Sequence, residues 1–149
     1  EAPAKEEEPG NTEPGPSKME TTPPEEKKET VQEKPSMVEA KKSLQNNEML
    51  ILLSDQDAGK KGIFVNFFNK PSSTPSGAAR YHQTMGSPLI FFSMVKTNNP
   101  HEANFERIDT TNMSIEDMVQ KYTSMLEQRI RKYPEQYFWP HKRWKTKPQ

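Results

Sequence analysis

The stretch IFVNFFNKPSSTPSGAARYHQTMGSPLIFFSMV, residues 63–95, has a strand signal at each end. Residues 63–68 alternate, so that every second residue from Ile63 to Phe67 falls on one face, which is typical of a strand. Residues 88–95 are apolar almost throughout, which indicates a strand buried on both faces, as in a parallel sheet. The stretch therefore predicts two strands of one sheet.

A helix signal lies between these two strands. Thr74 followed by Pro75 is a hydroxyl N-cap before a proline at the first helical position, and Gly86 is a typical C-terminal stop. The helix is therefore predicted from Pro75 to about Met85, after a turn at residues 69–73. A strand, a helix and a strand in this order predict a βαβ unit with parallel strands and a right-handed crossover.

Further elements lie on either side of this unit. Residues 38–47 predict a short helix, and the continuous apolar run EMLILL, residues 48–53, predicts another strand buried on both faces. Residues 103–108 predict a weaker strand. These elements extend the predicted sheet in both directions along the chain.

The clearest helix follows Ser114, which forms a capping-box pattern with Asp117. Apolar residues recur at helical spacing from Ile115 to Tyr133, and Pro134 ends the pattern. The stripe predicts a long helix that docks one face on the sheet.

The predicted fold class is α/β, a partial and mostly parallel sheet flanked by helices over residues 37–149. Three or four strands and three helices are fewer than a doubly covered sheet usually has. We therefore expect this region to be the C-terminal part of a larger α/β domain.

Residues 1–36 have a different composition from the rest of the chain. They contain seven prolines, ten glutamates and five lysines, a net charge of −5, and no aromatic residue. Such a segment buries too little apolar surface to offset the entropy of ordering its backbone, so we expect a disordered acidic Pro/Glu/Lys-rich leader. The remaining residues carry 16 basic and 11 acidic side chains, a net charge of +5.

The composition also excludes some classes of site. There is no cysteine, which rules out disulfides and thiolate metal sites. The longest apolar runs fall far short of the ~20 residues that a membrane-spanning helix needs.

Polar candidates follow the predicted strand at residues 48–53, and aromatic candidates lie within the later predicted strands. Asp55, Gln56 and Asp57 come directly after an apolar run, where open α/β sheets place ligands, although a solvated turn explains them as well. Four phenylalanines of the predicted strands suit an acyl-chain groove, and they also suit plain core packing: Phe67, Phe68, Phe91 and Phe92.

The end of the chain mixes aromatic rings and cations. This mixture suits the boundary between lipid headgroups and acyl chains, and it consists of Trp139, Trp144, His141, Lys142, Arg143 and Lys145. The same mixture suits single-stranded nucleic acid, through base stacking and phosphate contacts, and a solvated tail is a third explanation.

Two blocks of sequence carry a family resemblance. The first runs from SDQDAG (54–59) through GIFVNFF (62–68) to STPSGAAR (73–80), and the second is PEQYFW (134–139) followed by HKRWKT (141–146). Together and in this order they resemble the lipid A biosynthesis acyltransferases, the late lauroyl and myristoyl transferases of the lysophospholipid acyltransferase superfamily. The resemblance covers roughly residues 38–148.

The resemblance implies an enzyme at the cytoplasmic face of the bacterial inner membrane. Such enzymes move an acyl chain from acyl carrier protein to a hydroxyl of a lipid A precursor, without metal or organic cofactor. The implied partners are acyl carrier protein, the precursor and an anionic membrane surface, and not nucleic acid. The implied substrate-binding residues are Asp55, Gln56, Phe67, Phe68, Thr74, Arg80, Trp139, His141, Arg143 and Lys145.

The catalytic histidine of such enzymes stands in an H-x-x-x-x-D/E motif upstream of the first block. In this chain only His101 and Glu106 have that spacing, and they follow the block, so we interpret them as coincidental. We expect a piece without the catalytic pair, inactive alone. The alternative is a non-catalytic lipid- or partner-binding module with a flexible acidic tether.

Overall fold

The computed structural model describes residues 35–98 and 100–148, so the predicted leader up to residue 34 lies outside the described residues. This part contains three α-helices, four strands and two short 3₁₀ helices. The first helix, α1 (Pro35–Gln45), begins inside the segment predicted as leader, three residues before the predicted helix start. The remaining elements are η1 (Gly59–Lys61), β1 (Ile63–Phe67), β2 (Lys70–Thr74), α2 (Gly77–Met85), β3 (Ile90–Val95), β4 (Glu102–Arg107), α3 (Ile115–Lys132) and η2 (Pro134–Gln136).

The first sheet is a two-stranded antiparallel hairpin of β1 and β2. Its turn residues Phe68 and Asn69 have φ angles of 51° and 58°, the left-handed pair that a tight two-residue hairpin requires. The strand signal at residues 63–68 is confirmed, whereas the turn predicted at residues 69–73 is wrong. The buried residues of β2 are hydroxyl side chains, so its sequence carries no apolar strand signal.

Helix α2 is confirmed, with Gly86 as its left-handed C-cap at φ 67°. Its start differs from the prediction, because Ser76 is the N-cap and Thr74 is the last residue of β2. The proline that suggested a first helical turn therefore lies in the two-residue link between strand and helix.

The second sheet is an antiparallel hairpin of β3 and β4. The predicted parallel βαβ unit is wrong, because β1 and β3 each pair with the next strand along the chain, in two separate sheets. A short link lets neighbouring strands pair antiparallel at a smaller loop-closure cost than a crossover. The fold class is α/β with small antiparallel sheets in the described residues.

The apolar run at residues 48–53 is not a strand. It forms an extended segment between α1 and η1, and the side chains of Met49, Ile51 and Leu53 are 73%, 62% and 78% exposed. The prediction of a strand buried on both faces is therefore wrong. Apolar composition alone does not specify a partner strand, and none of the described strands pairs with this run.

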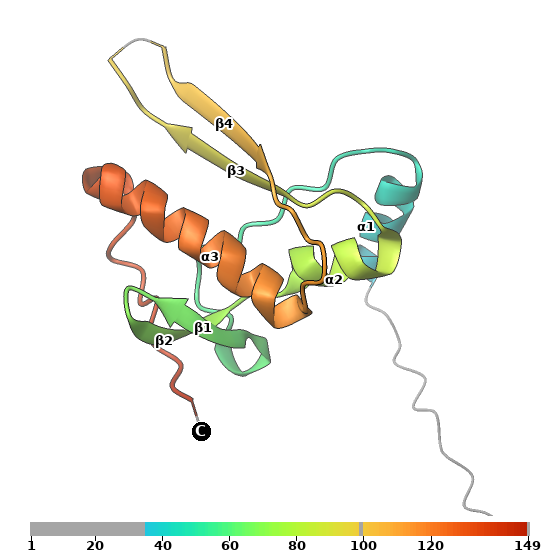
Figure 1. Ribbon diagram of the computed structural model, residues 1–149, viewed down its shortest axis with the longest axis horizontal. Coiled ribbons are helices and arrows are strands. Elements are labelled where there is room, and N and C mark those ends of the chain that lie inside the picture. Colours follow the sequence, from blue (N-terminus) through green and yellow to red (C-terminus); the bar gives the residue numbers. More distant parts are fainter. Residues whose placement is uncertain (1–34, 99, 149) are drawn as a thin grey trace, which may run out of the picture. The chain divides into compact units, whose positions relative to one another are not determined.

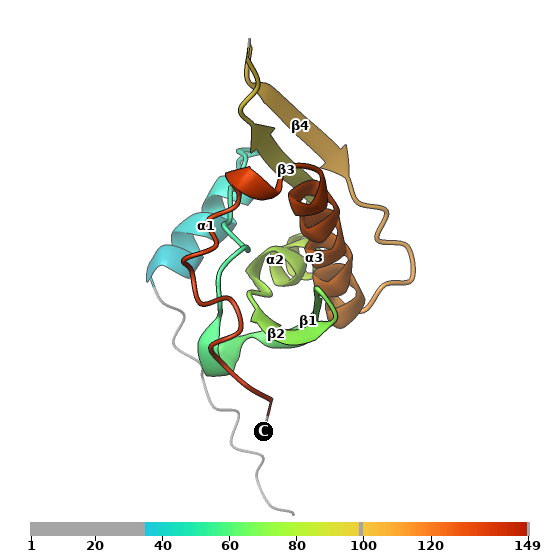
Figure 2. The same cartoon turned by 90° about the vertical axis from the view of Figure 1, so that its left-hand side faces the viewer.

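Helix α3 lies between the two hairpins, as Figures 1 and 2 show. Its predicted capping box is present, since Ser114 Oγ accepts from the Asp117 amide and the Asp117 carboxylate accepts from the Ser114 amide. The predicted apolar stripe is confirmed as the centre of the core. That core contains Val65, Ala79, Leu89, Ile108, Met118, Val119, Tyr122 and Met125.

Two further features of the described residues bear on the choice of site. No helix there is long and apolar enough to cross a membrane. Within residues 35–98 and 100–148, no group of three or more acidic or histidine side chains is placed to hold a metal ion.

Candidate functional site

Residues 137–146, here named the C-terminal strap, run back from α3 along the β1–β2 hairpin (Figure 2). The strap is irregular, so its backbone depends on partners from elsewhere in the chain. These partners come from the loop before β1 and from the hairpin itself. The two blocks of sequence that carry the family resemblance therefore meet in space.

Asp57 holds one end of the strap. Its carboxylate accepts hydrogen bonds from the Thr146 hydroxyl at 2.7 Å and the Thr146 amide at 3.1 Å, and it also accepts from the Gly59 amide at 2.9 Å. The Asp57 amide donates to His141 Nε2 at 3.1 Å. One residue thus orders its own loop and binds the strap at two places.

Arg143 holds the middle of the strap and is only 1% exposed. Its guanidinium donates to the Ser72 hydroxyl, to the Ser73 carbonyl at 2.7 Å and to the Thr74 hydroxyl at 2.6 Å. The Ser72 hydroxyl donates in return to the Arg143 carbonyl at 3.1 Å. The buried hydroxyl groups of Ser72 and Thr74 in β2 therefore have this arginine as a hydrogen-bond partner.

The loop before β1 packs closely against the same strand. The Ser73 hydroxyl donates to the Gly59 carbonyl at 2.6 Å. At Gly62 an added Cβ atom would lie 2.1 Å from Ser73 Oγ and 2.7 Å from Ala58 Cβ. The close approach of loop and strand therefore requires glycine at this position.

The electrostatics of the strap follow from its burial. Burial lowers the pKa of the Arg143 guanidinium, and the neighbouring Tyr137 and Asp57 oppose this effect. Burial alone would raise the pKa of Asp57, but the hydrogen bonds from Thr146 and Gly59 outweigh it and lower the pKa. Both groups are therefore charged at neutral pH, and their attraction favours the docked strap.

Aromatic rings join the strap to the hairpin. Phe67 is fully buried, and its ring stacks on the Trp144 ring at 5.4 Å between centroids. The Arg143 guanidinium lies 5.2 Å from the centroid of the Phe67 ring. Tyr137 makes edge contacts with Phe67 and Trp139, and its hydroxyl donates to the Asp55 carbonyl at 3.2 Å. The result is one continuous aromatic and cationic cluster.

The structure brings together most of the residues expected to bind substrate. Asp55 and Thr74 contact the strap through hydrogen bonds, and Phe67 and Phe68 contact it through their rings. The strap itself contributes Trp139, His141, Arg143 and Lys145. Arg80 lies apart on the exposed side of α2, where it donates to Ser76 at 3.0 Å, and Gln56 is exposed.

Sequence reasoning missed several residues that hold this cluster. Thr146 and Tyr137 bind the loop before β1, and Ser72 and Ser73 bind Arg143. Asp57 was a candidate, but for ligand binding and not as an anchor. A buried arginine requires acceptors, yet the sequence does not indicate that they lie about 70 positions away.

The three histidines have separate surroundings. His82 Nδ1 lies 2.7 Å from the Ser87 carbonyl, and His141 Nε2 accepts from a backbone amide. His101 is exposed, and an extended β4 separates it from Glu106 by roughly 16 Å of chain. In the part of the chain that the structure describes, no histidine forms an ion pair with a carboxylate.

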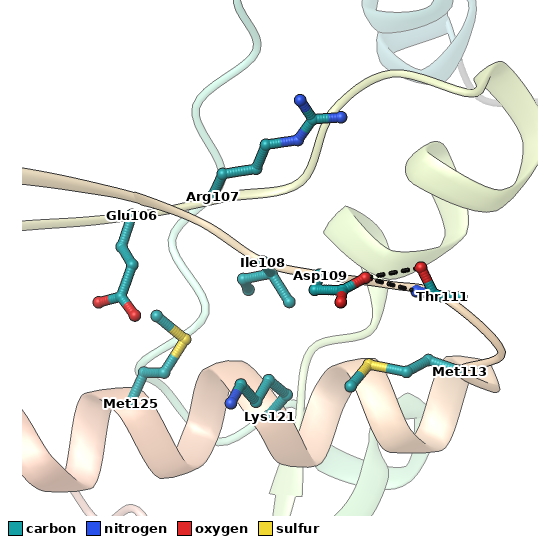
Figure 3. Close-up of a pocket in the computed structure, with 8 residues that line it drawn as sticks. All are labelled: Glu106, Arg107, Ile108, Asp109, Thr111, Met113, Lys121 and Met125. Atoms are coloured by element: carbon teal, nitrogen blue, oxygen red, sulfur yellow. Dashed lines mark hydrogen bonds between the residues drawn. The ribbon is translucent and has the colours of Figure 1, made fainter.

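Two grooves lie away from the strap, on the side of α3 that faces the β3–β4 hairpin. The larger, of about 350 Å³, is shown in Figure 3, where the Glu106 side chain points toward α3 and Arg107 points the opposite way. The second, of about 210 Å³, shares Glu106 and Met125 with the first. Charged side chains line both, so neither is an apolar acyl-chain tunnel.

Comparison with known proteins identifies the family. A comparison with curated proteins gives no match. The family model of the bacterial lipid A biosynthesis acyltransferases matches residues 21–146, which starts inside the predicted leader and ahead of the expected limit at residue 38. The match covers most of the chain and both blocks that the strap joins. The chain therefore belongs to the bacterial lipid A biosynthesis acyltransferase family, whose function is of the lipid A acyltransferase type, with a lipid A or acyl-type substrate.

Proposed function

We propose that the chain acts in the transfer of an acyl group from acyl carrier protein to a hydroxyl of a lipid A precursor, at the cytoplasmic face of the bacterial inner membrane. The observation that carries this proposal is the junction at Asp57. Its hydrogen bonds with Thr146 join the two blocks typical of the family, across 89 positions of sequence, and its bond with Gly59 orders the loop of the first block.

In this proposal the strap and the β1–β2 hairpin form one wall of the substrate site. Phe138 is 69% exposed and Trp139 is 47% exposed, so aromatic surface is available beside the buried cluster. Lys142 and Lys145 are exposed on the same strap. Aromatic surface suits the acyl chain, and the lysines suit anionic headgroups.

Arg143 positions this wall and does not touch substrate. Its guanidinium donates hydrogen bonds to Ser72, Ser73 and Thr74, and the side chain is nearly inaccessible to solvent. We therefore assign substrate contact to the exposed residues of the strap, and we assign the order of the strap to Arg143 and Asp57.

In the same proposal, neither His101 nor Glu106 is the general base. A hydroxyl at its ordinary pKa is a poor nucleophile, so transfer requires a base oriented by a second group. His101 has no carboxylate partner among the described residues, and His141 Nε2 is engaged by the Asp57 amide. We propose that this chain alone binds substrate and does not turn it over.

The test measures binding and transfer separately. The full chain is titrated with lipid A precursor in neutral detergent micelles, and with micelles that contain phosphatidylglycerol in place of the precursor. We expect tighter binding to the precursor, and weaker binding after Asp57→Asn, which removes an acceptor that Thr146 requires. Equal binding to both micelles would favour the non-catalytic lipid-binding module instead.

Transfer is measured with acyl carrier protein that carries a radiolabelled acyl chain as donor. We expect no labelled precursor above the rate without protein. Turnover that disappears in His101→Ala would contradict the assignment of the base and make His101 catalytic.

A further inference from the structure

The β3–β4 hairpin has two faces of different composition. In the antiparallel register Ile90 lies opposite Arg107, Phe92 opposite Phe105 and Met94 opposite Ala103, so these six side chains share one face. The other face holds Phe91 and Val95, which pack toward α3 and the core.

The first face, here named the outer face, is exposed over its whole length. Ile90 is 49% exposed, Phe92 43%, Met94 65% and Phe105 64%. The rings of Phe92 and Phe105 contact each other at 4.9 Å between centroids. Four large apolar side chains that line up along one hairpin form a patch of the kind that marks an interaction surface.

Charge is segregated between the two faces. The carboxylates of this hairpin, Glu102 and Glu106, are both on the inner face, and Figure 3 shows Glu106 directed toward α3 while Arg107 is directed away. The outer face has Arg107 at its base, and Lys96, which is exposed, follows β3 at the other end. Among its strand residues the outer face is thus an apolar stripe with no acidic residue and a cation at each end, and the nearest carboxylate to Arg107 along the chain on this side is Asp109, beyond the end of β4.

This combination fits a lipid surface of negative charge. Apolar side chains enter the boundary between headgroups and acyl chains, while arginine and lysine extend their cations toward phosphates. A protein partner of opposite charge would also attract the cations. A lipid surface fits better, because its charged headgroup layer covers an apolar layer, and the outer face likewise has cations at its two ends and apolar side chains between them.

We infer that the outer face of the β3–β4 hairpin docks on an anionic lipid surface and holds the strap near its lipid substrate. This inference rests on the proposed function, since it concerns how the same chain approaches a substrate that resides in a membrane. The hairpin is held to η2, which follows α3, because the Gln136 side chain accepts from the Lys96 amide at 2.7 Å and donates to the Lys96 carbonyl at 2.9 Å. Docking of the hairpin therefore orients the body of the protein.

The first experiment measures flotation of the full chain with vesicles of phosphatidylcholine, with or without phosphatidylglycerol. We expect binding to the anionic vesicles and at least about tenfold weaker binding for the double variant Phe92→Ser/Phe105→Ser. Arg107→Ser should weaken binding about fivefold, the effect of one cation near an anionic surface. Circular dichroism checks that each variant remains folded.

Matched controls separate this face from others. Phe64→Ser removes a 38% exposed aromatic from the β1–β2 hairpin and should leave binding unchanged. The triple variant Lys142→Ser/Lys145→Ser/Lys147→Ser removes the exposed cations of the chain end. Loss of binding in the triple variant, with binding retained in the double variant, would overturn the inference and place membrane contact at the strap.

A second measurement places the face directly. Tryptophan introduced by Phe92→Trp should be quenched by brominated lipid, whereas tryptophan introduced by Phe64→Trp should add no quenching to that of the native protein. Equal quenching of both tryptophan variants would contradict lipid docking. So would a native protein that is dimeric while the Phe92→Ser/Phe105→Ser variant is monomeric. Precursor binding in micelles tests the proposed function independently, so its retention in the double variant distinguishes failure of the two proposals.

Discussion

Replacing Arg143 with alanine removes a buried cation from three acceptors at once. The guanidinium donates to Ser72, Ser73 and Thr74, and the backbone carbonyl of Arg143, which the variant keeps, accepts from the Ser72 hydroxyl. A hydrogen bond from a charged donor contributes about 1.5–3 kcal/mol. Burial of the charge and an Nε that has no partner among the described residues offset part of the total. We expect Arg143→Ala to reduce the free energy of unfolding by about 3–5 kcal/mol, because the lost hydrogen bonds from the charged guanidinium outweigh the burial cost that the alanine variant no longer carries.

Urea denaturation followed by circular dichroism measures this loss, with an unchanged m-value as the sign that the unfolded state is the same. Arg143→Lys keeps the charge but lacks the planar fork that reaches several acceptors, so we expect a loss of about 2 kcal/mol. The control is Arg131→Ala, which breaks a partly exposed pair with Glu127 and should cost under ~1 kcal/mol. If Arg143→Ala costs no more than this control, the strap is not held by its buried guanidinium.

Three other substitutions test the core, the strap and a helix end. Met125→Asp puts an unpaired carboxylate in the core and should cost at least about 3 kcal/mol in urea denaturation, whereas a loss under ~0.5 kcal/mol would mean that this face is exposed. The lowered pKa of Asp57 means that its contribution is present above the ordinary carboxylate pKa of about 3.9 and is lost as the pH falls through the folded value. The stability difference between the native chain and Asp57→Asn should therefore shrink below about pH 4, and a difference independent of pH would refute this. Ser114→Ala removes the acceptor for the Asp117 amide and should lower the free energy of unfolding by about 1 kcal/mol in urea denaturation. No loss would mean that water replaces the Ser114 hydroxyl equally well.

The sequence predicted elements whose signals are local. Helix α3 follows from its capping box and apolar stripe, and the end of α2 follows from Gly86, because each depends on residues within a few positions. Strand β2 was missed because its buried residues are serine and threonine. They bond polar partners such as Arg143 and give no apolar strand signal. No local pattern carries that information.

Strand pairing was the larger error. The apolar run at residues 48–53 and the run at residues 88–95 look alike in sequence, yet only the second is paired, with β4. Pairing depends on which strand can reach which, and the hairpin connections of β1 with β2 and β3 with β4 settle it. Periodicity gives the face of a strand, as for Val65 and Phe67, but not its neighbour.

The candidate site was found through family resemblance and not through spacing. The two blocks were identified, and the structure joins them, but the anchoring roles of Asp57 and Thr146 depend on a contact over 89 positions. The resemblance implied that Arg143 binds substrate beside other cations, which requires an accessible side chain, and this side chain is buried. A charge run is usually solvated, so the sequence favoured the wrong environment for this one residue.

The long reach of the strap also affects the order in which the molecule is made. Strand β2 and the loop at Asp57 are synthesised some 70 to 90 residues before Arg143 and Thr146, their main partners. A contact so distant in sequence forms late, because the intervening chain must close a long loop first. At translation speeds of about 5–20 residues per second, the β1–β2 hairpin remains without its arginine for several seconds. During that interval its buried hydroxyl groups depend on water, so a nascent chain stalled before Arg143 should be more sensitive to protease at β2 than the finished chain.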